Sequence, residues 1–462
     1  MEKVKKPKDP YRFSVGRLFA FKSSDISAAW INLIMLNYLS LYASDTLGVG
    51  IGTVGTLLLV SKIFDAFTDV IAGYVVDNTK TKWGKGRPYE LCIFGMCICT
   101  VLLFSASPEW SQFAKCAWIF CMYTLAFSGF STFRTTGANP YTIRAFGNNP
   151  EALKKVASFG GIITMGGSII MSVAFPRILA AIGETASGWR MVVLVVMVGA
   201  ALVGMFRFIF IKEDPSVDEG DKHEKVSVKE IFTLFGKNKY TWLYAIIMLC
   251  YNISTNLAAG TYYFKYIVGD LGSLGMVSVF GIALLPLMLL FPWIMKKIGS
   301  MGKMVAYFCI FGIAGYLTVF FGEANLGMVY GGLVVGTLAT LPIAYYGILF
   351  IMNICGYNEM IGLPRMDGSS AILANFATKL GAALGSWITG ILLMLAGYVS
   401  AEGATTQSTS ALMMIRIDYA IVPAICLAIM AVCCFAFAKL EPQVAAFEAQ
   451  KKAGAEAAVE EA

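Results

Sequence analysis

Two aspartates, Asp65 and Asp69, lie four residues apart in residues 51–76, a segment that is otherwise apolar enough to cross a lipid bilayer. A spanning helix needs about 20 such residues. The i, i+4 spacing places both carboxylates on one face of a helix. Because a charge at the bilayer centre costs at least ~2.5 kcal/mol on insertion scales, we expect a positive charge between them. A transported cation is the simplest candidate, and Na+, Li+ and H+ all remain open.

Other residues could complete this site. Thr68 lies on the same helix and could add an oxygen ligand, because small hard cations take carboxylate, hydroxyl and carbonyl oxygens. A proton would serve instead if one carboxyl retains it, which burial beside a like charge favours. Lys379, deep inside another apolar segment, is the expected partner of the two aspartates when no cation is bound. The alternative is a static ion pair that only holds helices together.

Polar and aromatic residues in other apolar segments are candidate ligands for a substrate. Aromatic rings can stack on a sugar, and hydroxyl and amide groups can bind a polar molecule. For the aromatic residues ordinary helix packing is the alternative, and for the amides it is hydrogen bonding between helices. The candidates are Asp25, Tyr123, Thr124, Phe127, Asn252, Asn256 and Asn375.

The composition is that of a protein with many membrane spans. Of 462 residues, 57% are hydrophobic and 14% are charged, whereas soluble proteins have about 25% charged residues. Apolar windows predict about twelve spanning helices, with starts near Ile26, Ile51, Leu91, Phe113, Val156, Met191, Thr241, Leu274, Lys303, Leu326, Ser369 and Leu412. The net charge of +7 comes mainly from the basic N-terminal tail and basic loops. This pattern predicts cytoplasmic termini and gives no reason to expect a nucleic-acid partner.

The order of polar and apolar segments predicts an all-α protein with two bundles of six helices. Short basic turns that contain glycine recur at residues 81–88 and 296–303, after the second and eighth predicted spans. Two parallel halves of this kind are typical of the major facilitator architecture. The predicted parts are an N-terminal tail (1–22), a first bundle (23–211), a linker (212–240), a second bundle (241–438) and a C-terminal tail (439–462).

Motifs for catalysis are missing from the sequence. The predicted spans contain no HExxH motif, Ser/His pair or metal cluster, and the single histidine, His223, lies in the polar linker. The eleven cysteines lie mainly in apolar segments, which indicates buried thiols rather than a redox or metal site. We therefore expect a monomeric transporter of a small molecule, without a cofactor, in the cell (inner) membrane, rather than an enzyme.

The run from Lys62 to Pro88, KIFDAFTDVIAGYVVDNTKTKWGKGRP, resembles the glycoside–pentoside–hexuronide:cation symporters, the melibiose permease-like branch of the major facilitator superfamily. The resemblance continues at residues 262–270 and 376–379 and extends over nearly the full chain. It implies a secondary active transporter that couples entry of a sugar, glycoside or uronic acid to Na+ or H+ by alternating access. The alternative on the same fold is an uncoupled facilitator or exporter of a non-sugar organic anion.

The resemblance also implies roles for single residues at the cation site. The two aspartates and the fourth-span threonine that form the family's cation site match Asp65, Asp69 and Thr124. Thr68 stands where the family has an asparagine, and the family's eleventh-span lysine matches Lys379.

The sugar site departs from the family pattern. Its two carboxylate positions fall at Ala29 and Phe127, and its arginine position falls at Lys154. Loss of both carboxylates predicts weak binding of neutral α-galactosides. Lys154 and Phe127 predict better binding of a ligand that carries a carboxylate or an apolar aglycone.

Overall fold

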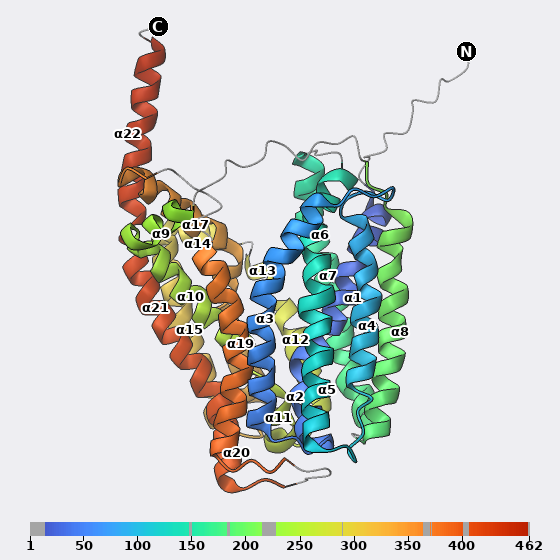
Figure 1. The fold of residues 1–462 in the computed structure, drawn as a ribbon. Helices are drawn as coiled ribbons and strands as arrows, with labels where there is room; N and C mark the ends of the chain where they lie inside the picture. The colour runs from blue at the N-terminus through green and yellow to red at the C-terminus, as the bar shows by residue number, and fades with distance from the viewer. Residues whose placement is uncertain are drawn as a thin grey trace, which may run out of the picture. The chain divides into compact units, whose positions relative to one another are not determined.

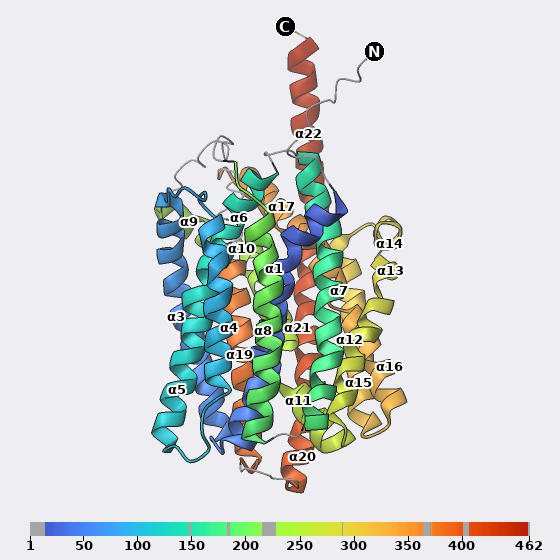
Figure 2. The same ribbon diagram turned by 90° about the vertical axis from the view of Figure 1, so that its right-hand side faces the viewer.

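The computed structural model describes residues 14–146, 150–182, 185–214, 228–288, 290–363, 370, 372–400 and 406–460 (Figures 1 and 2). Within these residues the secondary structure is helical, apart from one isolated bridge between Thr81 and Gly84. The chain divides into two compact units: unit 1 is Met1–Lys222 with Ser400–Ala404, and unit 2 is His223–Val399 with Thr405–Ala462.

Unit 1 is a bundle of long helices interrupted by short π-helical turns. Its elements are α1 (Val15–Leu33), η1 (Ile34–Tyr38), α2 (Leu39–Leu41), η2 (Tyr42–Thr46), α3 (Ile51–Asn78), η3 (Arg87–Leu91), α4 (Cys92–Leu103), α5 (Gln112–Thr124), η4 (Leu125–Ser131), α6 (Thr132–Ala145), α7 (Pro150–Ile182) and α8 (Ala186–Phe210). Helix α1 packs against α7 and α8, and α3 packs along α5, η4 and α6. The second and fourth expected spans therefore lie side by side.

Unit 2 has the same helical character. Its elements are α9 (Val228–Lys237), α10 (Lys239–Thr255), α11 (Ala259–Tyr263), η5 (Phe264–Val268), η6 (Leu271–Ser273), α12 (Leu274–Ala283), α13 (Leu285–Met288), α14 (Phe291–Ile298), α15 (Met301–Gly322), α16 (Leu326–Leu338), α17 (Leu341–Met360), α19 (Ile372–Leu395), α20 (Thr409–Arg416), η7 (Ile417–Ile421), α21 (Val422–Phe437) and α22 (Glu441–Glu460). Helix α10 packs against α19 and α21, and α15 packs against α16 and α21.

Two glycines allow α19 to approach α10 closely. A Cβ atom at Gly381 would lie 2.5 Å from the carbonyl oxygen of Leu249, and one at Gly385 would lie 2.9 Å from the backbone of Asn256. Real side chains do not fit at these distances. The GxxxG spacing in this span therefore serves helix packing.

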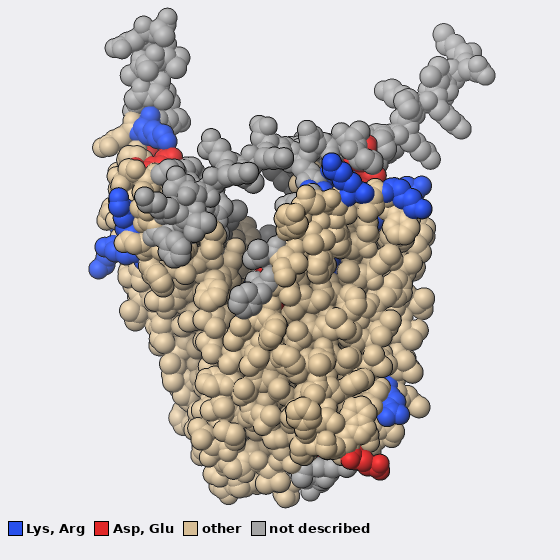
Figure 3. Space-filling model, viewed as in Figure 1, with Lys and Arg blue, Asp and Glu red and all other residues tan. Residues whose placement is uncertain are grey.

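Nine helices among the described residues are long and apolar enough to cross a membrane. The other three expected spans correspond to elements that depart from a long uncharged helix. Helix α3 is long but carries Lys62, Asp65 and Asp69, α4 is short and follows the 3-10 turn η3, and the eighth span is divided into α12 and α13. Figure 3 shows that the sides of the helices in each unit are largely uncharged on this face, and that the Lys, Arg, Asp and Glu in view lie mainly near helix ends.

The two basic turns of the sequence repeat each receive a carboxylate of their own unit, from the segment after α8 in unit 1 and from the start of α22 in unit 2. In unit 1, Glu213 accepts hydrogen bonds from the backbone amides of Lys85 (2.6 Å), Gly86 (2.8 Å) and Arg87. In unit 2, Glu441 accepts hydrogen bonds from the amides of Met301 (2.9 Å) and Gly302 (2.6 Å). Unpaired amides at such turns and helix starts favour an anion.

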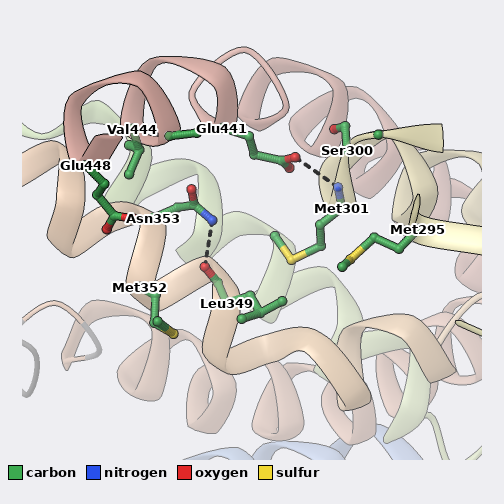
Figure 4. Close-up of a pocket in the computed structure, with 11 residues that line it drawn as sticks. Met295, Ser300, Met301, Leu349, Met352, Asn353, Glu441, Val444 and Glu448 are labelled. Atoms are coloured by element: carbon green, nitrogen blue, oxygen red, sulfur yellow. Dashed lines mark hydrogen bonds between the residues drawn. The ribbon is translucent and has the colours of Figure 1, made fainter. Parts of the chain in front are cut away.

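The carboxylate of Glu441 lies at one side of a pocket of about 340 Å³ within unit 2 (Figure 4). The pocket is lined by α14, α15, α17 and α22, and by the turn between α14 and α15. The residues after Leu440 form α22, which ends at Glu460. Helix α22 packs against α17, and its Lys451 pairs with Glu359 at 2.9 Å.

Candidate cation and substrate site

Asp65 and Asp69 lie one turn apart on α3, and both side chains are partly exposed. The hydroxyl of Thr132, the first residue of α6, donates a hydrogen bond of 2.8 Å to Asp65 Oδ1. This bond holds one carboxylate oxygen in a defined direction and leaves the other available.

Other hydroxyls extend this contact between the second and fourth spans. Thr124 donates a hydrogen bond of 2.8 Å to the hydroxyl of Ser61, which lies one turn before Asp65 on α3. Thr68 donates to the backbone carbonyl of Asp65 at 3.0 Å. Both threonines lie on or against α3 near Asp65, and their hydroxyls bond to Ser61 and to the backbone. Their role as cation ligands remains a prediction.

The sequence reasoning missed Thr132, and the reason is local geometry. Thr132 follows Thr124 by eight residues, so in an uninterrupted α-helix the two side chains would diverge by about 80°. The fourth span contains the π-helical turn η4 between them. A π-helical turn takes in an extra residue, which returns Thr132 to the face that meets α3. No sequence signal that we used reveals such a turn.

Two aromatic residues of the fourth span also face α3. The ammonium group of Lys62 lies 4.3 Å from the ring centroid of Phe127 and 5.8 Å from that of Tyr123. The two rings are themselves 4.6 Å apart, and both are buried. A positive charge over aromatic faces is a stabilising arrangement. Lys62 therefore places a cation one turn before Asp65, beside the residues that we expected at the substrate.

Asp25 on α1 occupies a different environment within unit 1. Its carboxylate pairs with Lys22 at 2.9 Å, Arg134 of α6 at 3.3 Å and Arg207 of α8 at 3.2 Å. Arg207 also lies 3.4 Å from Glu90, and both of these side chains are almost fully buried. The structure thus assembles an ionic cluster of three cations and two carboxylates from four segments of the chain.

The charged groups of the cluster also pack against aromatic and polar side chains. The guanidinium of Arg207 lies 4.0 Å from the ring centroid of Phe21 and 4.9 Å from that of Tyr141. Arg134 also donates to the hydroxyl of Ser24 at 3.2 Å. These contacts give Asp25 a clear role in joining α1, α6 and α8. Contact between Asp25 and a substrate remains a prediction.

The remaining candidates are spread over both units. In unit 2, Asn252 is buried and donates to the carbonyl of Met248 at 2.8 Å, and Asn256 donates to the carbonyl of Asn252 at 2.9 Å. Asn375 is exposed on α19, and Lys379 is partly exposed one turn further along the same helix. Lys154 belongs to α7 of unit 1, and its side chain lies outside the described set.

The geometry therefore brings α3, which carries Asp65, Thr68 and Asp69, against the fourth span, which carries Tyr123, Thr124 and Phe127. The described residues contain no cluster of three or more histidine, cysteine or acidic residues able to hold a metal ion. Two carboxylates with hydroxyls beside them suit a weakly held and exchangeable cation. Asp25 belongs instead to the ionic cluster.

Comparisons with known proteins also match this chain to membrane transporters. Residues 20–441 match the profile of the family described as MFS/sugar transport protein. The isoprimeverose transporter of Lactiplantibacillus pentosus is 27% identical over 94% of this chain and 91% of its own length. A glucuronide carrier protein homolog of Escherichia coli K12 is 26% identical over 84% of each chain. The crystal structure of the nucleoside transporter NupG superposes with a TM-score of 0.64 at 15% identity, over 92% of this chain and 99% of that one, which is a likeness of fold.

Proposed function

The chain belongs to the MFS/sugar transport protein family, and from this premise we propose that it is a secondary active transporter that couples entry of a sugar, glycoside or uronic acid to Na+ or H+. The protein is a multi-pass membrane transporter and not an enzyme. One observation supports the coupling most. Asp65 is partly exposed within a membrane helix, is oriented by Thr132 at 2.8 Å, and has Asp69 one turn away.

The physical argument is that two carboxylates in this position need a positive charge that can leave. An intramembrane charge is costly when it is unpaired, and a cation that enters with the substrate removes that cost during transport. We propose that Lys379 is the alternative partner when the cation is absent, so that cation binding and lysine release exclude one another. A coupling free energy of this kind is typically about 1–3 kcal/mol, or roughly 5–150-fold in affinity.

The proposed substrate is a glycoside or uronate rather than a neutral α-galactoside. The relatives are named for isoprimeverose and for glucuronides, and Phe127 occupies a position where the symporters have a carboxylate. Its buried ring beside Tyr123 and Lys62 offers an apolar face next to a positive charge. We further propose that the protein resides in the cell (inner) membrane with both termini in the cytoplasm and works as a monomer.

The test is uptake by the purified protein in proteoliposomes with an imposed Na+ or H+ gradient. Isoprimeverose, a glucuronide and melibiose are offered as labelled substrates. We expect accumulation of at least one of the first two above the outside concentration, and its loss when the gradient is collapsed. Transport that only equilibrates the substrate under every gradient would establish an uncoupled facilitator. Equal uptake of melibiose and the glucuronide would refute the proposed substrate class.

A further inference from the structure

A carboxyl group lies fully enclosed in unit 2, far along the chain from the site on α3. Asp418 belongs to the π-helical turn η7, between α20 and α21, and its side chain is 0% exposed. Among the described residues, neither carboxyl oxygen has a hydrogen-bond partner. Buried polar side-chain atoms nearly always have one. A buried carboxyl without a hydrogen-bond partner is therefore unusual for a residue with a purely structural role.

One polar side chain of a neighbouring helix faces Asp418. It is Thr389 of α19, which is 1% exposed and whose hydroxyl also makes no hydrogen bond of good geometry among the described residues. Helix α19 packs against α20 (Figure 1), and α20 ends at the residue before η7 begins. Single π-helical turns within longer helices occur frequently at functional sites. A carboxyl and a hydroxyl are thus left facing each other at such a turn.

No described cation neutralises this carboxyl. The elements around η7 are α11, α15, α20 and α21, with α19 beside α20. Arg416 of α20 bonds instead to Glu323 at 2.9 Å and to the carbonyl of Phe320 at 2.6 Å. The other titratable groups of this surrounding include Tyr263, Tyr316, Lys379, Tyr419 and Cys426, and none of them bonds to Asp418.

A carboxylate without a cation or a hydrogen bond in an apolar interior costs so much that the group takes up a proton instead. The neutral acid has one O–H donor besides its acceptor oxygens, so it can bond with the Thr389 hydroxyl after a small rotation. We propose that Asp418 and Thr389 form a proton-binding site in unit 2, separate from the carboxylate pair of α3. The acid holds its proton while enclosed and exchanges it with water when the packing around η7 opens.

The proposal does not depend on the substrate or on the coupling ion at Asp65. Its test is infrared difference spectroscopy of the full-length protein in lipid nanodiscs, wild type minus Asp418→Asn. We expect a carbonyl stretching band of a protonated carboxyl at neutral pH that is missing in the variant. We also expect this band to shift after transfer to D2O, because the proton exchanges when the site opens.

Two further variants test whether the band belongs to Asp418. Glu90→Gln removes another buried acid, one that has Arg207 at 3.4 Å, and should leave the band in place. Thr389→Val should shift the frequency of the band, and it serves if Asp418→Asn does not fold. An absent band, an equal band in Asp418→Asn, or a band that never shifts in D2O would each overturn the proposal, the last because the proton would then be permanent.

Discussion

Asp65 on α3 and Asp418 on η7 are both acids within apolar helices beside a threonine hydroxyl, yet their surroundings differ in access. Asp65 is partly exposed, is bonded by Thr132 and has Asp69 one turn away. Asp418 is 0% exposed and its oxygens have no hydrogen-bond partner among the described residues. A carboxylate that water can reach can bind and release a metal cation. An enclosed one can be neutralised only by the smallest cation, the proton.

Asp25 shows a third arrangement, in which the neutralising charges belong to the protein. Lys22, Arg134 and Arg207 all lie within 3.3 Å of its carboxylate. Such a cluster is strongly destabilised when one member is removed, because an uncompensated buried charge remains. We therefore expect three ways of neutralising an acid in this protein: a cation that exchanges, a bound proton, and basic side chains of the chain itself.

The largest effect is expected at the carboxylate pair. Asp65→Asn or Asp69→Asn should reduce gradient-driven accumulation in proteoliposomes to simple equilibration, because the amide keeps the shape but loses the charge that binds a cation. Folding should persist, as judged by gel filtration. Glu109→Gln, in an exposed turn, is the control and should accumulate substrate like the wild type. Full accumulation by either aspartate variant would remove the cation site from α3.

The next effect concerns stability in the ionic cluster. Arg207→Met should lower the free energy of unfolding by about 3–5 kcal/mol, because Glu90 loses its cation in a buried setting. Lys451→Met breaks an exposed pair with Glu359 and should cost no more than about 1 kcal/mol. Thermal unfolding in detergent compares the two. Equal losses would mean that burial does not distinguish these ion pairs.

A smaller effect separates two threonines of the fourth span. Thr132→Val should weaken cation binding by roughly 10–150-fold, since a hydrogen bond to a charged group contributes about 1.5–3 kcal/mol. Thr124→Val should have less effect, because its hydroxyl bonds to Ser61 rather than to an aspartate. The measurement is the cation concentration that gives half-maximal uptake. The reverse order would favour Thr124 as the ligand, as the family resemblance implies.

The smallest effects are expected at the two carboxylates that hold the basic turns. Glu213→Gln and Glu441→Gln each replace charge-assisted bonds by neutral ones and should cost about 1–2 kcal/mol each. Glu213 should cost more, because it accepts from three amides rather than two. The double variant should show additive losses in thermal unfolding, since sites without shared partners usually add. Strong non-additivity would indicate that the two turns are coupled.

The sequence was most informative where hydrophobicity and charge decide the structure. The charged second span follows from composition and spacing, and the contact between the second and fourth spans is what the family resemblance implies. Thr132 could not be found this way, because the π-helical turn η4 changes which residues share a face. Two of the three partners of Asp25 come from α6 and α8, far away in sequence. Asp418 was missed because its enclosure depends on tertiary packing around η7.

Binding of the cation itself tests the central claim most directly. Thermal unfolding of the wild type, of Asp65→Asn and of Asp69→Asn is followed as Na+ replaces a bulky organic cation, and separately as pH is lowered, without any sugar. A cation that binds only the folded state raises its stability. The proposed site predicts that Na+ or H+ stabilises the wild type and that this stabilisation is lost in both variants. Equal stabilisation of all three proteins would contradict a cation site at Asp65 and Asp69.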